Sequence, residues 1–267
     1  MRPAAVAGVF YPGSPAELAH EVAGLIAGVR RDRAHRSAPK AIIAPHAGYV
    51  YSGAVAASVY ALLEPARTQI KRVVLLGPTH RVAVRGLALP EAQGFATPLG
   101  TVGIDAAVVA ALRGLPQITA SEAVHAREHS LEVHLPFLQT MLEDFALVPL
   151  AVGDAAPEEV AEVLDTLWGG PETLIVASSD LSHYLPYRQA QLIDKATAEA
   201  ILGLSTAIGH EQACGATPVA GLTLVARRRG LQPQLVDLRN SGDTAGDKSR
   251  VVGYGAFAFY EGSANAH

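Results

Sequence analysis

Cysteine is nearly absent from this sequence, as are long apolar runs and any large excess of one charge. The single Cys214 excludes an internal disulfide, which is typical of a reducing cytosol. No apolar stretch approaches the roughly 20 residues that a membrane span needs, and the apolar residues 6–9 are too few for a signal peptide. The net charge of −4 comes without a basic stripe, so neither nucleic acid nor a membrane is an expected partner. We therefore expect a cytoplasmic protein.

Linker sequences are absent too. No Pro/Gly/Ser-rich or charged segment divides the 267 residues, of which 49% are apolar, so we expect a single domain over residues 1–267. Apolar runs of strand length occur at 40–44, 72–76, 145–152, 173–177, 234–238 and 251–260. Helical periodicity occurs at 14–26, 53–63, 104–112, 131–142, 157–167, 189–204 and 218–229. Residues 86–103 are broken by proline and glycine and predict a short hairpin. The alternation predicts an α/β fold with a mostly parallel or mixed central sheet flanked by helices.

Three histidines follow predicted strands within a few residues: His46, His80 and His183. The carboxyl ends of parallel strands open onto the ligand crevice of such a sheet, so these side chains are expected at one edge. Imidazole is the commonest metal-binding side chain, and nitrogen ligands favour iron, copper or zinc over magnesium. The sequence therefore predicts a transition-metal site at this edge.

A second histidine-rich segment, residues 125–134, admits three interpretations. His125 and His129 are four residues apart, so on one helix they would share a face and form an independent zinc site. The nearby Glu128 is not placed as in the H-E-x-x-H zinc helix. A carboxylate or imidazole from this segment would alternatively orient the second ring nitrogen of a metal ligand. A purely structural role is the third interpretation.

Three further features carry open alternatives. Asp180 lies three residues before His183, a spacing that permits an Asp–His pair, while the absence of a G-x-S-x-G elbow argues against a serine hydrolase. The loop 240–248, rich in glycine and aspartate, is either a turn or a lining of the same crevice. Cys214 precedes a predicted helix, so it is either an activated nucleophile or a small buried thiol.

Six motifs, in this order, resemble the Memo family, whose prokaryotic members are called AmmeMemoRadiSam system protein B. They are G-V-F-Y-P at 8–12, A-P-H-A-G-Y at 44–49, L-G-P-T-H at 76–80, E-H-S-L-E-V-H-L-P at 128–136, S-S-D-L-S-H at 178–183 and A-C-G at 213–215. The resemblance covers residues 2–260. It implies an α/β fold similar to that of class III extradiol dioxygenases, which open catechol rings with non-haem Fe(II).

The resemblance also implies roles for individual residues. It maps metal ligands onto His46 and His80, and a catalytic acid–base pair onto Asp180 and His183. The animal protein of the family supplies a cysteine as third ligand from the loop before the last strand. Counting back from Tyr254 without gaps puts Thr244 at that place, beside Asp243.

The third ligand therefore stays open between His183 and Asp243. Two histidines and one carboxylate suit Fe(II), which we expect as the cofactor, with copper or zinc as alternatives. Thr244 and Tyr49 are then expected to contact substrate.

Two functions are consistent with these features. The first is a metal-dependent, dioxygenase-like or redox enzyme of unknown substrate. The second is a non-catalytic protein that uses the same pocket to recognise a small molecule or peptide. Tyrosines near the histidines suit such recognition, because tyrosine combines apolar area with a hydrogen-bonding tip. They are Tyr49, Tyr51 and Tyr184.

Overall fold

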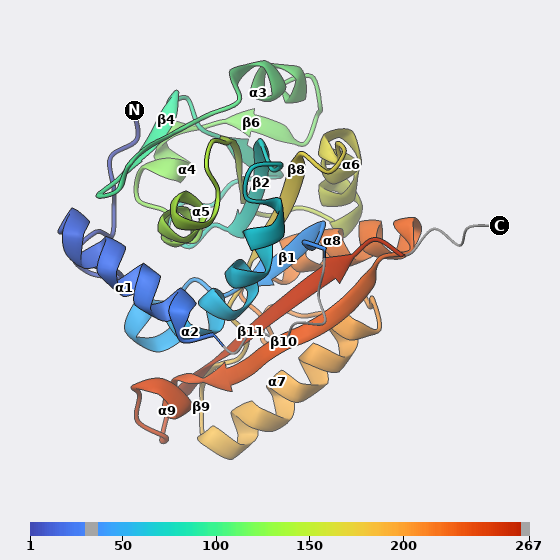
Figure 1. The fold of residues 1–267 in the computed structure, drawn as a ribbon. Helices are drawn as coiled ribbons and strands as arrows, with labels where there is room; N and C mark the ends of the chain where they lie inside the picture. Colours follow the sequence, from blue (N-terminus) through green and yellow to red (C-terminus); the bar gives the residue numbers. More distant parts are fainter. Residues whose placement is uncertain (30–36, 263–267) are drawn as a thin grey trace.

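The computed structural model describes residues 1–29 and 37–262 (Figure 1). Its strands are β1 (Ala41–Ala44), β2 (Arg72–Pro78), β3 (Leu87–Leu89), β4 (Gly94–Thr97), β5 (Gly100–Gly103), β6 (Ile118–Ala120), β7 (Ala146–Val152), β8 (Thr173–Ser178), β9 (His183–Leu185), β10 (Gln232–Asn240) and β11 (Val251–Tyr260). Its helices are α1 (Pro15–Ala27), α2 (Tyr49–Tyr60), η1 (Ala61–Ala66), α3 (Ala106–Leu112), α4 (Glu122–Ala126), η2 (Glu132–His134), α5 (Leu135–Met141), α6 (Pro157–Leu167), α7 (Tyr187–Leu202), α8 (Ala216–Arg229) and α9 (Ser241–Thr244).

A mixed central sheet organises the described residues. Its strand order is β10-β11-β1-β8-β2-β7-β3-β6, and β9 pairs with β11 outside this path. Strands β1, β8, β2 and β7 are parallel to one another, whereas β11 is antiparallel to β1 and β3 is antiparallel to β7. The central strands are buried on both faces, which explains their continuous apolar runs. The predicted α/β fold with a mixed sheet is confirmed.

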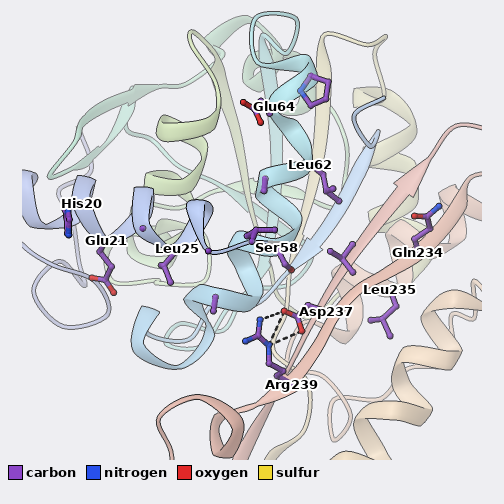
Figure 2. A pocket seen from close by; sticks show the side chains of 17 residues that line it. His20, Glu21, Leu25, Ser58, Leu62, Glu64, Gln234, Leu235, Asp237 and Arg239 are labelled. Carbon is purple, nitrogen blue, oxygen red and sulfur yellow. Dashed lines mark hydrogen bonds and ion pairs between the residues drawn. The ribbon is translucent and has the colours of Figure 1, made fainter. Parts of the chain in front are cut away.

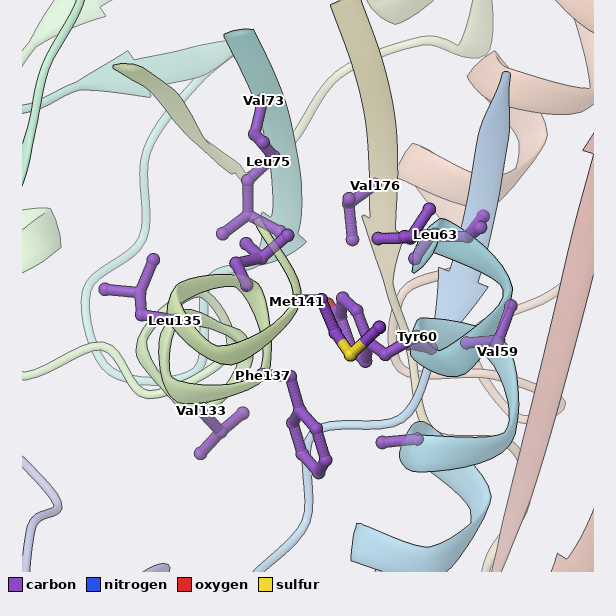
Figure 3. Close-up of a cluster of buried hydrophobic side chains, with 14 of the residues drawn as sticks. Val59, Tyr60, Leu63, Val73, Leu75, Val133, Leu135, Phe137, Met141 and Val176 are labelled. Atoms are coloured by element: carbon purple, nitrogen blue, oxygen red, sulfur yellow. The ribbon is translucent and has the colours of Figure 1, made fainter. Parts of the chain in front are cut away.

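Helices cover both faces of this sheet. Successive residues of β2 alternate between two cores: Val73 and Leu75 pack on one side, and Val74 and Leu76 pack on the other. The first core includes side chains of α1, α2 and α5, and Figure 3 shows part of it between α2, α5 and the strands. The second core includes side chains of α6, α7 and α8. The sheet is therefore covered on both faces, and ligands can approach at the strand ends.

The structure differs from the predicted elements in two places, where a glycine or the shortness of a strand obscured the sequence pattern of the element. Helix α2 begins at Tyr49 and contains Gly53 in its interior, where a Cβ atom would lie 2.9 Å from Leu25 Cδ1 of α1. Close packing of two helices, rather than a helix start, explains this glycine. Residues 94–103 do form the β4–β5 hairpin, but β3 leaves it and joins the central sheet beside β7. No helix in the described ranges is long and apolar enough to cross a lipid bilayer.

Candidate metal centre

The carboxyl ends of β1, β8 and β2 meet at one edge of the sheet. These strands are adjacent and parallel, and Ala44 at the end of β1 pairs with Ser178 at the end of β8. His46, Asp180 and His80 each lie two residues beyond the last residue of one of these strands. The register of the parallel strands therefore brings two imidazoles and one carboxylate to the same edge.

A third imidazole joins them from a different part of the chain. His46, His80 and His129 each offer a ligand atom, and these three atoms all lie within 4.8 Å of one another. His129 comes from the segment between α4 and η2, and its ring centroid is 4.5 Å from that of His80. His46 is buried, while His80 is partly open to solvent. We call these three residues the histidine triad.

The carboxylate of Glu128 fixes His80 and the segment that carries His129. Its Oε1 accepts a hydrogen bond from His80 Nδ1 at 2.9 Å, and its Oε2 accepts one from His80 N at 2.6 Å. Oε1 also accepts from the backbone nitrogens of His129 and Ser130, both at 2.9 Å. Burial alone would raise the pKa of Glu128, but these hydrogen bonds lower it to about 2. An ionised carboxylate that accepts a hydrogen bond from Nδ1–H of His80 leaves Nε2 of that ring as a ligand atom.

The triad fits a borderline transition metal. Burial and the neighbouring imidazoles lower the pKa of His46 well below its ordinary range, and burial lowers that of His129 to about 4. Both rings are therefore neutral near pH 7 and offer lone pairs. His129 Nδ1 is buried, makes no hydrogen bond with any residue that the structure describes, and lies 3.3 Å from Glu128 Oε1. Neutral imidazole suits zinc, copper, iron or nickel.

Asp180 contacts His46. Its Oδ1 accepts a hydrogen bond from His46 N at 2.7 Å, and its Oδ2 lies 4.0 Å from His46 Nε2. Burial raises the pKa of Asp180 to about 7, although the hydrogen bond from His46 N opposes this shift. No hydrogen bond joins Asp180 to His183 in the described residues. In place of the predicted pair with His183, Asp180 contacts His46 on the neighbouring strand-end segment after β1.

His183 is not a member of the triad. It lies on β9, five residues beyond β8, and pairs with Val252 of β11. It is half-buried, and burial lowers its pKa. The adjacent Tyr184 has a φ of 58°, a left-handed conformation that is uncommon for a residue other than glycine, and its side chain is 63% exposed. The turn after Asp180 therefore presents His183 beside the triad and Tyr184 to solvent.

Asp243, Thr244 and Tyr49 have other partners. Asp243 is exposed, and its carboxylate accepts hydrogen bonds from Tyr187 Oη and Asn240 N at the start of α9. Thr244 Oγ1 donates to the Ser241 carbonyl at 3.2 Å. Tyr49 is buried and donates to the Val133 carbonyl at 2.7 Å. Asp243 therefore caps the start of α9, and its predicted role as a metal ligand stays a prediction, as do the substrate contacts predicted for Thr244 and Tyr49.

His125 is buried and Cys214 is half-buried, and both have partners in the surrounding structure. Helix α4 ends at Ala126, so His125 and His129 do not share a helix face, and His125 Nε2 donates to the Ala88 carbonyl at 2.8 Å. Burial and the charge of Asp180 raise the pKa of the Cys214 thiol, which argues against the activated nucleophile. Its Sγ lies 3.3 Å from His46 Nε2.

A separate groove lies between α1, α2 and β10 (Figure 2). Its volume is about 1080 Å³, and its lining includes Leu25, Ser58, Leu235 and the ion pair between Asp237 and Arg239. No member of the histidine triad lines it. The candidate metal centre therefore stands on the geometry of the strand ends and not on this groove.

Three buried histidines should make the metal-free fold sensitive to acid. Burial lowers the pKa of His125 to about 4, of His129 to about 4 and of His134 to about 3, whereas each is near 6.5 in an unfolded chain. Between pH 6.5 and 4 the unfolded chain binds more protons, so the free energy of unfolding falls as the pH falls. Each such histidine contributes up to about 1.4 kcal/mol per pH unit in this window. Asp180 has the opposite effect on stability. Because its pKa is raised in the folded protein, the folded state binds one more proton there than the unfolded chain does.

Urea denaturation of the metal-free protein at pH 7 and pH 5 measures this effect. His125→Gln is the matched variant, because an amide still donates to the Ala88 carbonyl but does not titrate. The free energy of unfolding of this variant should differ less between pH 7 and pH 5 than that of the wild type, because one titrating histidine has been removed. Equal stability at both pH values in the wild-type protein would contradict the prediction.

Sequence and structure comparisons agree with this architecture. The family model described as "Memo: Memo-like protein" matches residues 2–258. A MEMO1 family protein of Archaeoglobus fulgidus is 36% identical, with 97% of this chain and 99% of that protein covered. A MEMO1 family protein of Aquifex aeolicus is 35% identical, with 95% and 97% covered.

A solved structure supports the fold alone. The uncharacterized protein JW3007 from Escherichia coli K12 superposes with a TM-score of 0.52 at 14% identity, over 82% of this chain and 98% of that chain. The family model and the curated relatives each span nearly the whole chain. On these matches, the chain belongs to the Memo family.

Proposed function

We propose that this protein is a metal-dependent oxidoreductase of the dioxygenase-like type, with one transition-metal ion held by His46, His80 and His129. The observation that carries the proposal is the convergence of three imidazoles beside the buried Asp180. Iron, the metal we favour, would supply redox chemistry with dioxygen and Lewis acidity toward a bound substrate hydroxyl.

The chain's own residues would bind the substrate and move protons. Asp180 has a pKa of about 7, so near neutral pH it exists in both protonation states, as a general acid–base requires. His183 lies beside the triad on β9 and provides a second proton acceptor with a lowered pKa. The partly exposed His80 marks the side from which a substrate reaches the triad.

Metal loading and oxygen uptake test this function. After anaerobic loading with Fe(II), elemental analysis should give about one iron per chain, and a catechol panel in an oxygen electrode should identify a substrate class. Asp180→Asn should keep the iron content and lower the rate of oxygen uptake about 10²-fold, because it removes the proton acceptor and keeps the shape. Equal oxygen uptake by wild type and Asp180→Asn would refute the acid–base role.

The alternative function is recognition of a small molecule or peptide without catalysis. The observation that favours it is the exposure of two tyrosines, since Tyr184 is 63% exposed and stacks with Arg250, and Tyr51 is 42% exposed. Tyrosine and arginine are enriched in recognition surfaces. Stoichiometric iron without oxygen uptake across the panel would favour this function over catalysis.

A further inference from the structure

A single hydroxyl at the end of β8 connects two parts of the histidine triad. Ser178 Oγ lies 2.6 Å from His46 Nδ1, 2.8 Å from His134 Nε2 and 2.7 Å from the Ser130 carbonyl oxygen. Ser130 directly follows His129. The hydroxyl therefore contacts the side chain of one triad residue and the backbone next to another, and water has no access because Ser178, His134 and His46 are all buried.

The number of protons fixes the direction of every hydrogen bond in this cluster. A hydroxyl has one proton to donate, and a carbonyl oxygen can only accept, so Ser178 donates to Ser130 O. Both imidazoles must then donate to Ser178, His46 through Nδ1–H and His134 through Nε2–H. The remaining nitrogen of His134, Nδ1, accepts the hydrogen bond of Tyr60 Oη at 2.8 Å. His46 is left with an unprotonated Nε2.

We propose that Ser178 is a positioning residue of the metal centre, whose hydroxyl holds His46 in the Nδ1–H tautomer with Nε2 available as a ligand. This inference rests on the proposed metal function. His134 donates to the same hydroxyl and helps to fix its position.

The opposite arrangement carries an energetic penalty. If His46 bore its proton on Nε2, its Nδ1 would be an acceptor, and Ser178 would have to give its only proton to His46 Nδ1. The buried carbonyl of Ser130 would lose its donor, at a cost of about 1–3 kcal/mol. The Ser130 carbonyl therefore biases His46 toward the Nδ1–H tautomer.

Tyr60 is itself held rigidly. Its ring is fully buried and stacks on Phe137, with centroids 5.1 Å apart and an interplanar angle of 3°. Figure 3 shows Tyr60 and Phe137 among the apolar side chains between α2 and α5. The series of hydrogen bonds that runs from Ser178 through His134 to Tyr60 ends in this core, so it does not lead to solvent. Its role is to orient the imidazoles and not to conduct protons.

Two substitutions test the proposal, with a matched control. Tyr60→Phe keeps the ring and removes the hydroxyl, and Ser178→Ala removes the shared contact. Ser58→Ala is the control, since it removes a buried hydroxyl from the same helix that bonds only to the Val55 carbonyl. The first readout is the set of imidazole ¹⁵N chemical shifts in the metal-free protein, which report the tautomer. The second is the Kd for Fe(II), measured anaerobically by calorimetry.

The wild-type protein and Ser58→Ala should show one His46 tautomer, protonated on Nδ1. Ser178→Ala should show mixed tautomers at His46 and weaken the Kd by about 10–100-fold. Tyr60→Phe should keep His46 protonated on Nδ1, because Ser178 still donates to the Ser130 carbonyl. A wild-type His46 protonated on Nε2, or an unchanged His46 tautomer in Ser178→Ala, would overturn the proposal. If the tautomer shifts as expected but the wild type binds no metal, the proposed function fails and the role of Ser178 in orienting His46 stands. If Ser178→Ala does not fold, the His46 tautomer of the wild type decides.

Discussion

Replacement of His129 by alanine should weaken Fe(II) binding by about 10²–10³-fold. A structural zinc site of four ligands is worth about 10–16 kcal/mol, so one ligand contributes roughly 3–4 kcal/mol. The Kd for Fe(II) should rise by the same factor in His46→Ala, because both side chains offer one nitrogen to the same group of ligands. Anaerobic calorimetry at one pH measures all of these variants.

Asp243→Asn is the variant that separates the structure from the sequence-based expectation. The exposed Asp243 binds Tyr187 and Asn240, so its replacement should leave the Kd for Fe(II) within about twofold of the wild type. If Asp243→Asn lost metal and His129→Ala kept it, the assignment of the triad would have to be abandoned in favour of a two-histidine, one-carboxylate site.

Replacement of Glu132 by alanine should lower the free energy of unfolding by about 3–5 kcal/mol, because it breaks a buried ion pair and leaves a buried charge on Arg2. Arg2 Nη1 donates to Glu132 Oε2 at 2.6 Å, and the two side chains are 1% and 0% exposed. The same carboxylate accepts from Ala5 N, Val6 N and Tyr11 Oη at 2.7, 3.0 and 2.6 Å. All four donors lose their partner at once.

Urea denaturation near pH 7 measures this loss. Glu199→Ala is the control, because its pair with Lys195 is exposed, with 3.9 Å between the charged atoms, and such helix pairs contribute about 0.2–0.5 kcal/mol. Glu132→Gln keeps the size of the side chain and isolates the charge. A loss below about 1 kcal/mol for Glu132→Ala would show that water or a rearranged segment replaces the carboxylate.

The edge of the sheet that carries the site could be predicted from the sequence. Parallel strands are recognisable as apolar runs, and their carboxyl ends meet at one edge, so His46 and His80 were placed there by spacing alone. His183 follows β8 by five residues rather than two. That difference of three residues is enough for the chain to turn back and pair with β11, which removes His183 from the triad.

The third imidazole could not be predicted, because it depends on contacts that no local pattern records. His129 is placed by Glu128, whose carboxylate binds His80 from a position 48 residues away along the chain. The segment 125–134 does not form the separate His125–His129 site, but its residues take several roles. His129 belongs to the triad, Glu128 and His134 orient neighbouring groups, and His125 and Glu132 stabilise the fold.

The partners of Asp243 could not be predicted for a different reason. Counting from Tyr254 located the loop, but the direction of a side chain at a helix start is set by capping. Asp243 accepts from Asn240 N, and Asn240 in turn accepts from Gly242 N, so the carboxylate is oriented by its own turn.

The hydrogen bonds that fix the triad join residues far apart along the chain, and this bears on when the site forms. His46 and Ser178 are separated by 132 residues, and His80 and Glu128 by 48. Contacts of such range close large loops and form slowly, after local helices and hairpins. In a zinc finger the metal drives a short chain to fold. Here the ligands come together only once β1, β8 and the segment after α4 have docked, so metal uptake is expected to follow the completion of the fold and not to start it.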